Sequence, residues 1–253
     1  FINNTAKLGG GIYWNRESVT IKNVVFENNN ATRGGAIYIP KTKATVSFNN
    51  FTYNNASQGG AIYVGHTYST ISDNNFTNNN ASQGGAIYVA LETTADNTDT
   101  TRNIFTGNTA EEGGAIYLPR INRGVSVTYS SFNDNHATIN GGGIYLGSKG
   151  FNNKYVTNCV FNNNTAGQYG GAIFIANTDH KISSCTFYGN NATEAGGAVY
   201  VDSSLTGIEI KDSTFKMSFS KNGGAIYNSA GASTTSLIIR NDTFIKNTAS
   251  YNG

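Results

Sequence analysis

Residues 51–64, FTYNNASQGGAIYV, contain two short motifs that recur along the whole chain. The first is Phe-x-x-Asn-x-Ala, which begins at Phe51, and the second is Gly-Gly-Ala-Ile-Tyr, which begins at Gly59. With Gly, Val and Phe as occasional variants, the Gly-Gly motif occurs nine times at spacings of 25 to 29 residues. The Phe motif alternates with it. A fixed period of this kind is typical of solenoid proteins, so the repeat sets the expected fold.

The length of the repeat excludes most helical repeat folds, whose units are longer and need helix-forming residues. Leucine-rich repeats have a suitable length, but their Leu-x-x-Leu-x-Leu pattern does not occur in the sequence. We therefore expect an all-β protein, a right-handed parallel β-helix (solenoid) of about nine coils of 25–29 residues. Residues 1–253 should form a single β-helix region. Since both ends fall inside a repeat, we expect this region to be a segment of a longer chain.

Side-chain alternation within the Gly-Gly motif predicts which positions face the core. Ile62 and Val64 should point inward with their equivalents in other coils, and Ala61 and Tyr63 should point outward. A second strand should carry the aliphatic residue that lies five positions before each Phe. The Phe itself should point inward on a third strand. The Asn three residues later should turn the chain back to the next Gly-Gly pair, because Asn tolerates the left-handed conformation and can form amide ladders between coils.

Variation in repeat length is confined to one part of the coil. The distance from Phe to the next Gly-Gly pair is 8 or 9 residues, whereas the distance from Tyr to the next Phe ranges from 13 to 17. Insertions should therefore lie at the corner between the first and second strands, with the longest near Leu91–Thr98 and Ser229–Thr235. Loops on a regular scaffold are a common place for binding, so we expect these corner loops to be displayed.

The aromatic column of the Gly-Gly motif is a candidate binding surface. If it faces outward, its rings form a stripe flat enough to stack sugar rings; alternatively, the rings only stabilise neighbouring strands. The column comprises Tyr13, Tyr38, Tyr63, Tyr88, Tyr117, Tyr145, Phe174, Tyr200 and Tyr227.

Two further sets of residues are candidate modification sites. Cys159 and Cys185 each lie two residues before a Phe in consecutive coils. Stacked positions about 4.8 Å apart are within disulfide range, but their parallel Cβ vectors disfavour the bond, so a disulfide and a pair of stacked thiols both stay open. The nine Asn-x-Ser/Thr sequons are close to the number expected by chance from 37 Asn. Sequons in the turn after Phe are candidates for glycosylation, at Asn30, Asn55, Asn80 and Asn191.

The composition excludes several classes of protein. The 14 Phe and 15 Tyr exclude a disordered chain, which lacks core-forming residues. A net charge of +2 does not indicate a nucleic-acid partner. No apolar run approaches the roughly 18 residues of a membrane helix, so this segment is not expected to insert into a membrane. We expect no bound cofactor.

The alternation of Phe-x-x-Asn with Gly-Gly-Ala-Ile resembles the repeats of chlamydial polymorphic outer-membrane proteins. It is also similar to the Asn- and Thr-rich adhesin-like surface proteins of methanogenic archaea. The resemblance covers the whole chain, although residues 215–218 (FKMS) depart from the motif. It implies a surface-displayed β-helix with a role in adhesion, an extracellular location at the cell surface and an anchor outside this segment. It supplies no catalytic residues.

We therefore expect a non-enzymatic repeat region of a cell-surface adhesin or surface appendage, whose rigid rod displays corner loops. Its partners would be cell-surface glycans or proteins of another cell, or neighbouring copies of itself. One alternative is a purely structural stalk or spacer.

The other alternative is a polysaccharide lyase or hydrolase of β-helix fold, which would need a pair or cluster of carboxylates. Asp212 and Asp242 lie in adjacent coils, but both replace Asn or Ser in a polar turn. His66, His136 and His180 fall in different columns, so no metal site is expected.

Overall fold

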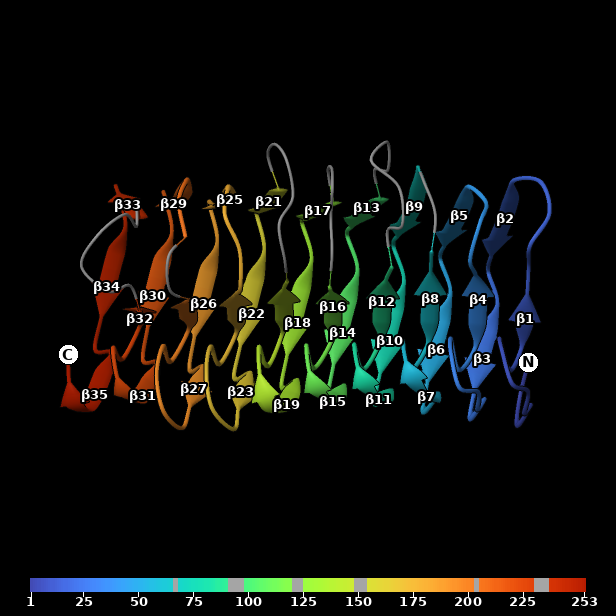
Figure 1. Ribbon diagram of the computed structural model, residues 1–253, viewed down its shortest axis with the longest axis horizontal. Helices are drawn as coiled ribbons and strands as arrows, with labels where there is room; N and C mark the ends of the chain where they lie inside the picture. Colours follow the sequence, from blue (N-terminus) through green and yellow to red (C-terminus); the bar gives the residue numbers. More distant parts are fainter. Residues whose placement is uncertain (66–67, 91–97, 120–124, 148–153, 203–204, 230–236) are drawn as a thin grey trace.

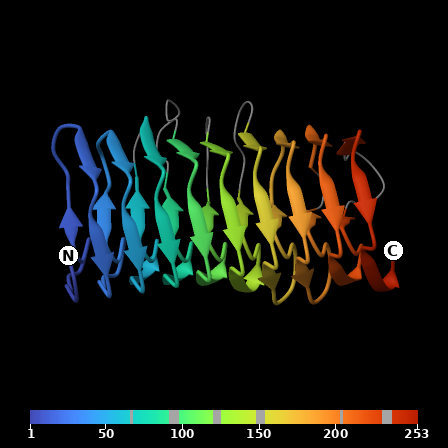
Figure 2. The ribbon, with the colours of Figure 1, turned by 180° about the vertical axis from the view of Figure 1, so that it is seen from behind.

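The computed structural model describes residues 1–65, 68–90, 98–119, 125–147, 154–202, 205–229 and 237–253. Throughout these residues the regular secondary structure is β-strand, and the chain winds into coils that stack along one axis. The two termini lie at opposite ends of this stack (Figures 1 and 2). The all-β parallel solenoid that the repeat predicts is confirmed. None of the described segments forms an apolar helix of membrane-spanning length.

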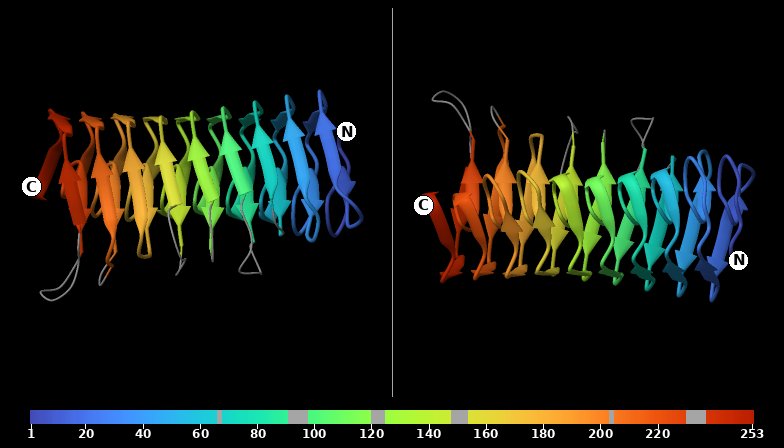
Figure 3. Two further views of the ribbon diagram at one scale, coloured as in Figure 1. Left: turned by 90° about the horizontal axis from the view of Figure 1, so that it is seen from above. Right: turned by 90° about the horizontal axis from the view of Figure 1, so that it is seen from below.

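The strands form four parallel sheets that run the length of the stack, and we name each sheet by its characteristic column. Seen from above and below, strands of successive coils lie side by side in sequence order (Figure 3). The Tyr sheet contains the Gly-Gly motif strands: β1 (Ile12–Tyr13), β4 (Ile37–Ile39), β8 (Ile62–Val64), β12 (Ile87–Val89), β16 (Ile116–Leu118), β20 (Ile144–Leu146), β24 (Ile173–Ile175), β28 (Val199–Val201) and β32 (Ile226–Asn228). The aliphatic sheet contains β2 (Val19–Lys22), β5 (Ala44–Ser47), β9 (Ser69–Ser72), β13 (Thr98–Thr101), β17 (Val125–Thr128), β21 (Lys154–Thr157), β25 (His180–Ser183), β29 (Ile208–Lys211) and β33 (Leu237–Arg240).

The other two sheets follow in the same coil. The Phe sheet contains β3 (Val25–Glu27), β6 (Asn50–Thr52), β10 (Asn75–Thr77), β14 (Ile104–Thr106), β18 (Ser131–Asn133), β22 (Val160–Asn162), β26 (Thr186–Tyr188), β30 (Thr214–Lys216) and β34 (Thr243–Ile245). The Ala sheet contains β7 (Asn55–Gln58), β11 (Asn80–Gln83), β15 (Thr109–Glu112), β19 (His136–Asn140), β23 (Thr165–Ala166), β27 (Asn191–Ala192), β31 (Phe219–Asn222) and β35 (Thr248–Asn252).

The Ala sheet corrects the predicted path of the chain. The sequence was expected to provide only a turn between Phe and the next Gly-Gly pair, but a further strand lies there. Its residues alternate polar, apolar, polar, as in Asn55, Ala56 and Ser57, which is the pattern of a half-buried strand.

Equivalent residues pair with one another even where the coils differ in length. Phe76 is in register with both Phe51 and Phe105, at separations of 25 and 29 residues. Thr98 likewise pairs with Ser69. The four additional residues are therefore accommodated between β12 and β13, at the predicted corner. Of the predicted longest loops, residues 91–97 and 230–235 lie outside the described residues.

A ladder of stacked Phe rings fills the centre of the β-helix. Neighbouring ring centroids are 4.6 to 5.1 Å apart. Its eight inner members, all 0% exposed, are Phe26, Phe51, Phe76, Phe105, Phe132, Phe161, Phe187 and Phe215. The aliphatic columns pack against this ladder in one continuous core, as predicted, and Ile71 in the second strand is also fully buried.

The Ala of the Gly-Gly motif belongs to this core, so its predicted outward orientation is wrong. Ala61 is 0% exposed and packs within the main apolar cluster. Where Gly replaces it, a Cβ on Gly11 or Gly143 would meet a Phe ring atom at 3.1 or 3.3 Å, which shows that this position points inward. The backbone explains the error, because the amides of Ala61 and Ile62 both donate to the carbonyl oxygen of Ala86. Ala61 therefore lies before the regular strand, and the alternation of side chains between the two faces begins only at Ile62.

The two glycines are required by the close approach of backbone to backbone. Gly84 has φ of +65°, and a Cβ there would lie 2.2 Å from the carbonyl oxygen of Ile87. A Cβ on Gly85 would lie 2.1 Å from the carbonyl oxygen of Gly114 in the next coil. Only glycine fits these positions without moving the chain, which explains why the pair recurs.

Buried Asn side chains join successive coils at the corner between the Phe and Ala sheets. Asn79 is 0% exposed, and its Nδ2 donates to Oδ1 of Asn108 and to the carbonyl oxygen of Phe51, both at 3.0 Å. Its backbone amide also donates to Oδ1 of Asn108, at 3.0 Å. The same pattern recurs along the column, so the predicted amide ladder is confirmed.

Candidate binding surface

The aromatic column of the Gly-Gly motif lies on the outer side of the Tyr sheet, but it is not an exposed stripe. Its rings stack along the axis with centroids 4.6 to 5.6 Å apart and form clusters separate from the core. Six of the nine are only 5–8% exposed: Tyr38, Tyr63, Tyr88, Tyr117, Phe174 and Tyr200. Tyr145 and Tyr227 are half-buried, and only Tyr13, at 51%, is largely exposed.

Stacking accounts for the burial, because each inner ring covers the faces of its neighbours. The column of residues before each Gly-Gly pair adds cover from the side, and the Arg33 guanidinium lies 5.7 Å from the ring centroid of Tyr63. The prediction of a sugar-stacking platform is therefore wrong for the six buried rings. They serve the alternative role that the sequence left open, which is to stabilise neighbouring strands.

Burial raises the pKa of two hydroxyls in the middle of this Tyr column, those of Tyr117 and Tyr145. Burial, with a smaller contribution from the Glu112 carboxylate, raises the pKa of Tyr117 well above its usual value. The same causes, together with the Asp202 carboxylate, raise the pKa of Tyr145 to about 12. The hydroxyls of Tyr117 and Tyr145 therefore stay protonated through neutral and moderately alkaline pH.

The two cysteines are buried thiols. A second buried amide ladder, of Asn49, Asn74 and Asn103, lies at the corner between the aliphatic and Phe sheets. Cys159 and Cys185 occupy the same column in later coils, and both are free. Their Sγ atoms donate to the carbonyl oxygens of Thr157 at 3.3 Å and Ser183 at 3.2 Å. Burial raises the pKa of the Cys185 thiol well above its usual value. Of the two alternatives, the structure contains the stacked thiols.

In the part of the chain that the structure describes, no three His, Cys, Asp or Glu side chains form a group that could hold a metal ion. Asp212 accepts a hydrogen bond from Nδ2 of Asn241, and Asp242 accepts one from the amide of Ser213, both at 2.7 Å. His136 contacts Thr165 in the Ala sheet, whereas His180 lies in β25. His66 lies outside the described residues.

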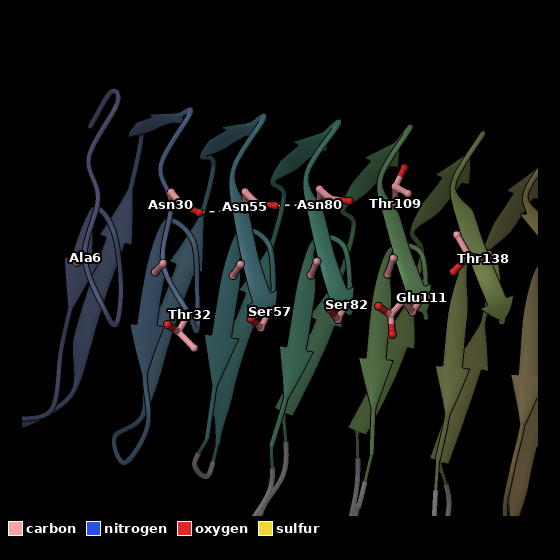
Figure 4. A pocket seen from close by; sticks show the side chains of 14 residues that line it. Ala6, Asn30, Thr32, Asn55, Ser57, Asn80, Ser82, Thr109, Glu111 and Thr138 are labelled. Carbon is pink, nitrogen blue, oxygen red and sulfur yellow. Dashed lines mark hydrogen bonds between the residues drawn. The ribbon is translucent and has the colours of Figure 1, made fainter.

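The outer face of the Ala sheet contains a groove that the sequence analysis did not predict. Its volume is about 550 Å³, and it runs across successive coils between two rows of polar side chains (Figure 4). The first row contains Asn30, Asn55, Asn80 and Thr109. The second row contains Thr32, Ser57, Ser82 and Glu111. Between the rows lie Ala31, Ala56, Ala81 and Ala110.

The Asn row is a further amide ladder, and this one is exposed. Nδ2 of Asn80 donates to Oδ1 of Asn55 at 2.8 Å, and Nδ2 of Asn55 donates to Oδ1 of Asn30 at 2.9 Å (Figure 4). An amide has two N–H donors and two acceptor lone pairs, so the central Asn55 keeps one of each for a ligand. The hydroxyls of the second row add further donors and acceptors, and among the described residues that line the groove Glu111 is the only ionisable one.

The sequence contained a signal for this groove, in the repeated triplet Asn-Ala-Ser/Thr. We interpreted that triplet as a glycosylation sequon. The structure shows that three of the four candidate Asn residues, Asn30, Asn55 and Asn80, line the groove. Asn191 is exposed at the start of β27 in the same sheet. Glycosylation of these residues stays a prediction.

Comparison with known families agrees with this architecture. The family model described as right handed beta helix region matches residues 1–167, which is more than half of the chain. The chain belongs to the right-handed β-helix family. A second family model, the Chlamydia polymorphic membrane protein repeat, matches residues 184–202 of this β-helix protein. That match confirms the resemblance to the chlamydial repeats and supports a surface-protein repeat region. Searches of curated proteins and of solved structures gave no match.

Proposed function

We propose that this β-helix is the repeat region of a cell-surface adhesin or surface appendage, located outside the cell and without enzymatic activity. The observation that carries the proposal is the groove of mostly neutral polar side chains along a rod whose coils are joined by buried Asn and Phe ladders. Such a scaffold holds a binding surface at fixed geometry. The match to a chlamydial membrane-protein repeat supports the surface location.

Adhesion can be tested with beads coated with the purified chain. We expect the beads to bind at least one cell type in a panel of bacterial and eukaryotic cells, and soluble chain to compete for that binding. Beads coated with an unrelated β-helix protein are the control. If no cell type binds the coated beads above this control, the adhesin proposal fails and a structural stalk takes its place.

The absence of enzymatic activity is tested separately. Purified chain is incubated with neutral and acidic polysaccharides, and both new reducing ends and unsaturated products are measured. We expect no product above the rate of a heat-inactivated sample. Product formation that follows the concentration of folded chain would contradict this part of the proposal.

A further inference from the structure

We propose that the groove of the Ala sheet binds one chain of a neutral, extended polysaccharide lying along the helix axis. This inference rests on the proposed adhesin function and names the ligand class for it. Three features of the groove carry it: the hydrogen-bonding character of its walls, the spacing of its repeating groups and its lack of anchors for other polymers.

The walls match a ligand rich in hydroxyl groups. Asn55, in the middle of the amide ladder, keeps one N–H donor and one acceptor site, and Ser57 and Ser82 opposite can each donate and accept. A sugar hydroxyl also donates and accepts, so it can satisfy both kinds of group. The described residues that line the groove include no cation for an anionic polymer, and Glu111 would repel a carboxylate. A neutral glycan is therefore favoured over an acidic one.

The repeat of the wall favours a linear polymer. Neighbouring parallel strands lie about 4.8 Å apart, so each wall presents an equivalent group once per coil at that interval. A polymer of sugar units in an extended conformation offers hydroxyls at a comparable interval along its length. Weak hydrogen bonds to several coils then act together, because each unit is tethered to units already bound.

A peptide fits this groove less well. An extended peptide usually binds by adding a strand to a free sheet edge, but the strands that form this surface already pair with neighbours in adjacent coils. Among the described residues of the groove, the side chains between the walls are small, such as Ala56 and Ala81, and they do not form the deep apolar pockets that anchor a folded protein partner.

The test uses affinity electrophoresis in gels that contain one soluble polysaccharide each: a mixed-linkage β-glucan, a galactomannan, an arabinoxylan or polygalacturonate. All proteins are made in a host without N-glycosylation, because a glycan on Asn55 would fill the groove. The groove variant S57L/S82L removes two hydroxyls and fills space between the walls. The control variant T52L/T77L makes a similar change in the same coils but on the outer face of the Phe sheet. Circular dichroism establishes that each variant is folded.

We expect at least one of the three neutral polysaccharides to retard the native chain, with at least a tenfold weaker effect on S57L/S82L and no change for T52L/T77L. The inference is overturned if no neutral polysaccharide retards the chain, if polygalacturonate binds in preference, or if both variants lose binding equally. The bead assay separates this inference from the proposed function. Undiminished cell binding by S57L/S82L would overturn the groove inference and leave the adhesin proposal intact. If treatment of the target cells with trypsin then abolishes bead binding, the partner is a protein.

Discussion

Neighbouring Asn residues in one coil have opposite roles, which shows how position decides the effect of a residue type. Asn79 is fully buried in the corner ladder, and Asn80 is exposed in the groove wall. The Oδ1 of Asn79 accepts hydrogen bonds from the backbone amide and the side-chain amide of Asn54, both at 3.0 Å. Removal of the Asn79 side chain would leave both of these buried donors of Asn54 without a hydrogen-bond partner. This loss is costly because water cannot replace the missing acceptor.

Replacing Asn79 by Ala should therefore destabilise the protein strongly. Each buried group left without a partner costs about 1–3 kcal/mol, so the variant should lose at least about 2 kcal/mol of unfolding free energy. The matched variant Asn80→Ala should change it by less than about 0.5 kcal/mol, as is usual for an exposed site. Urea unfolding followed by circular dichroism measures both. Similar losses for the two variants would contradict the assigned roles.

The Phe ladder makes a comparable prediction for packing. Phe132 is 0% exposed, and its ring centroid lies 4.7 Å from those of both Phe105 and Phe161. Phe132→Ala should lower the unfolding free energy by roughly 3–5 kcal/mol, because it leaves a cavity in a continuous core. A loss below about 1 kcal/mol in the same urea experiment would reject the interior ladder.

Some corner residues are poorly suited to their backbone conformation. Phe48 has φ of 57° and is 61% exposed, and the equivalent residue one coil earlier is Asn23, also at 57°. The left-handed conformation costs a residue with a bulky side chain about 1–2 kcal/mol, whereas Asn adopts it readily. Phe48→Asn should therefore raise the unfolding free energy by about 1 kcal/mol. Phe51→Asn, which places an amide in the core, is the destabilising control, and no gain for Phe48→Asn would contradict the strain argument.

At the scale of the strand, the sequence predicts correctly which side chains face the core wherever residues alternate regularly between the two faces of a strand. The aliphatic columns around Ile62 and Ile71 are buried as expected. The Ala of the Gly-Gly motif was misplaced because the shared carbonyl acceptor at the strand start breaks the alternation. The Ala sheet was missed because its strands follow directly after a tight Asn corner and are as short as two residues at Thr165–Ala166.

The groove was missed for a related reason. The triplets that form it alternate polar, apolar, polar over only three residues of each coil, which is too short a run to separate a strand from an ordinary turn. Only stacking of the coils turns Asn55 and Ser57 into rows with a channel between them. The burial of the Tyr rings could not be predicted from a single coil either, because each ring is covered by the rings of the neighbouring coils.

The Tyr sheet predicts a loss of stability at alkaline pH. Unfolded Tyr titrates near pH 10, whereas the pKa of Tyr145 in the folded chain is about 12 and that of Tyr117 is also raised. Above pH 10 the folded state therefore binds more protons than the unfolded state. The contribution of the protonated Tyr hydroxyls to the unfolding free energy is complete below about pH 10 and should be lost as pH rises toward and beyond 12. Tyrosinate absorbance and urea midpoints measured across this range test it. Titration of all Tyr near pH 10 with the fold intact would contradict the buried ladder.

At the scale of the whole molecule, coils of different length stack in the same register, because the additional residues lie at one corner and the ladder residues still pair with their equivalents in the next coil. Asn79 pairs with Asn54 of the preceding coil at a separation of 25 residues and with Asn108 of the following coil at a separation of 29. The groove, the Phe core and the Tyr column all depend on this constant stacking. We therefore conclude that the buried Asn ladder sets the register of the β-helix.

Scalar coupling across hydrogen bonds, observed by NMR in the isotope-labelled chain, tests whether the Asn ladder sets the register. We expect a coupling between the side-chain amide nitrogen of Asn79 and the Cγ of Asn108, since Nδ2 donates to Oδ1 at 3.0 Å. We also expect the equivalent coupling from Asn54 to Asn79, across the shorter coil. Coupling of Asn79 to an Asn of any other register, or rapid exchange of its side-chain amide protons with solvent, would show that this ladder does not set the register.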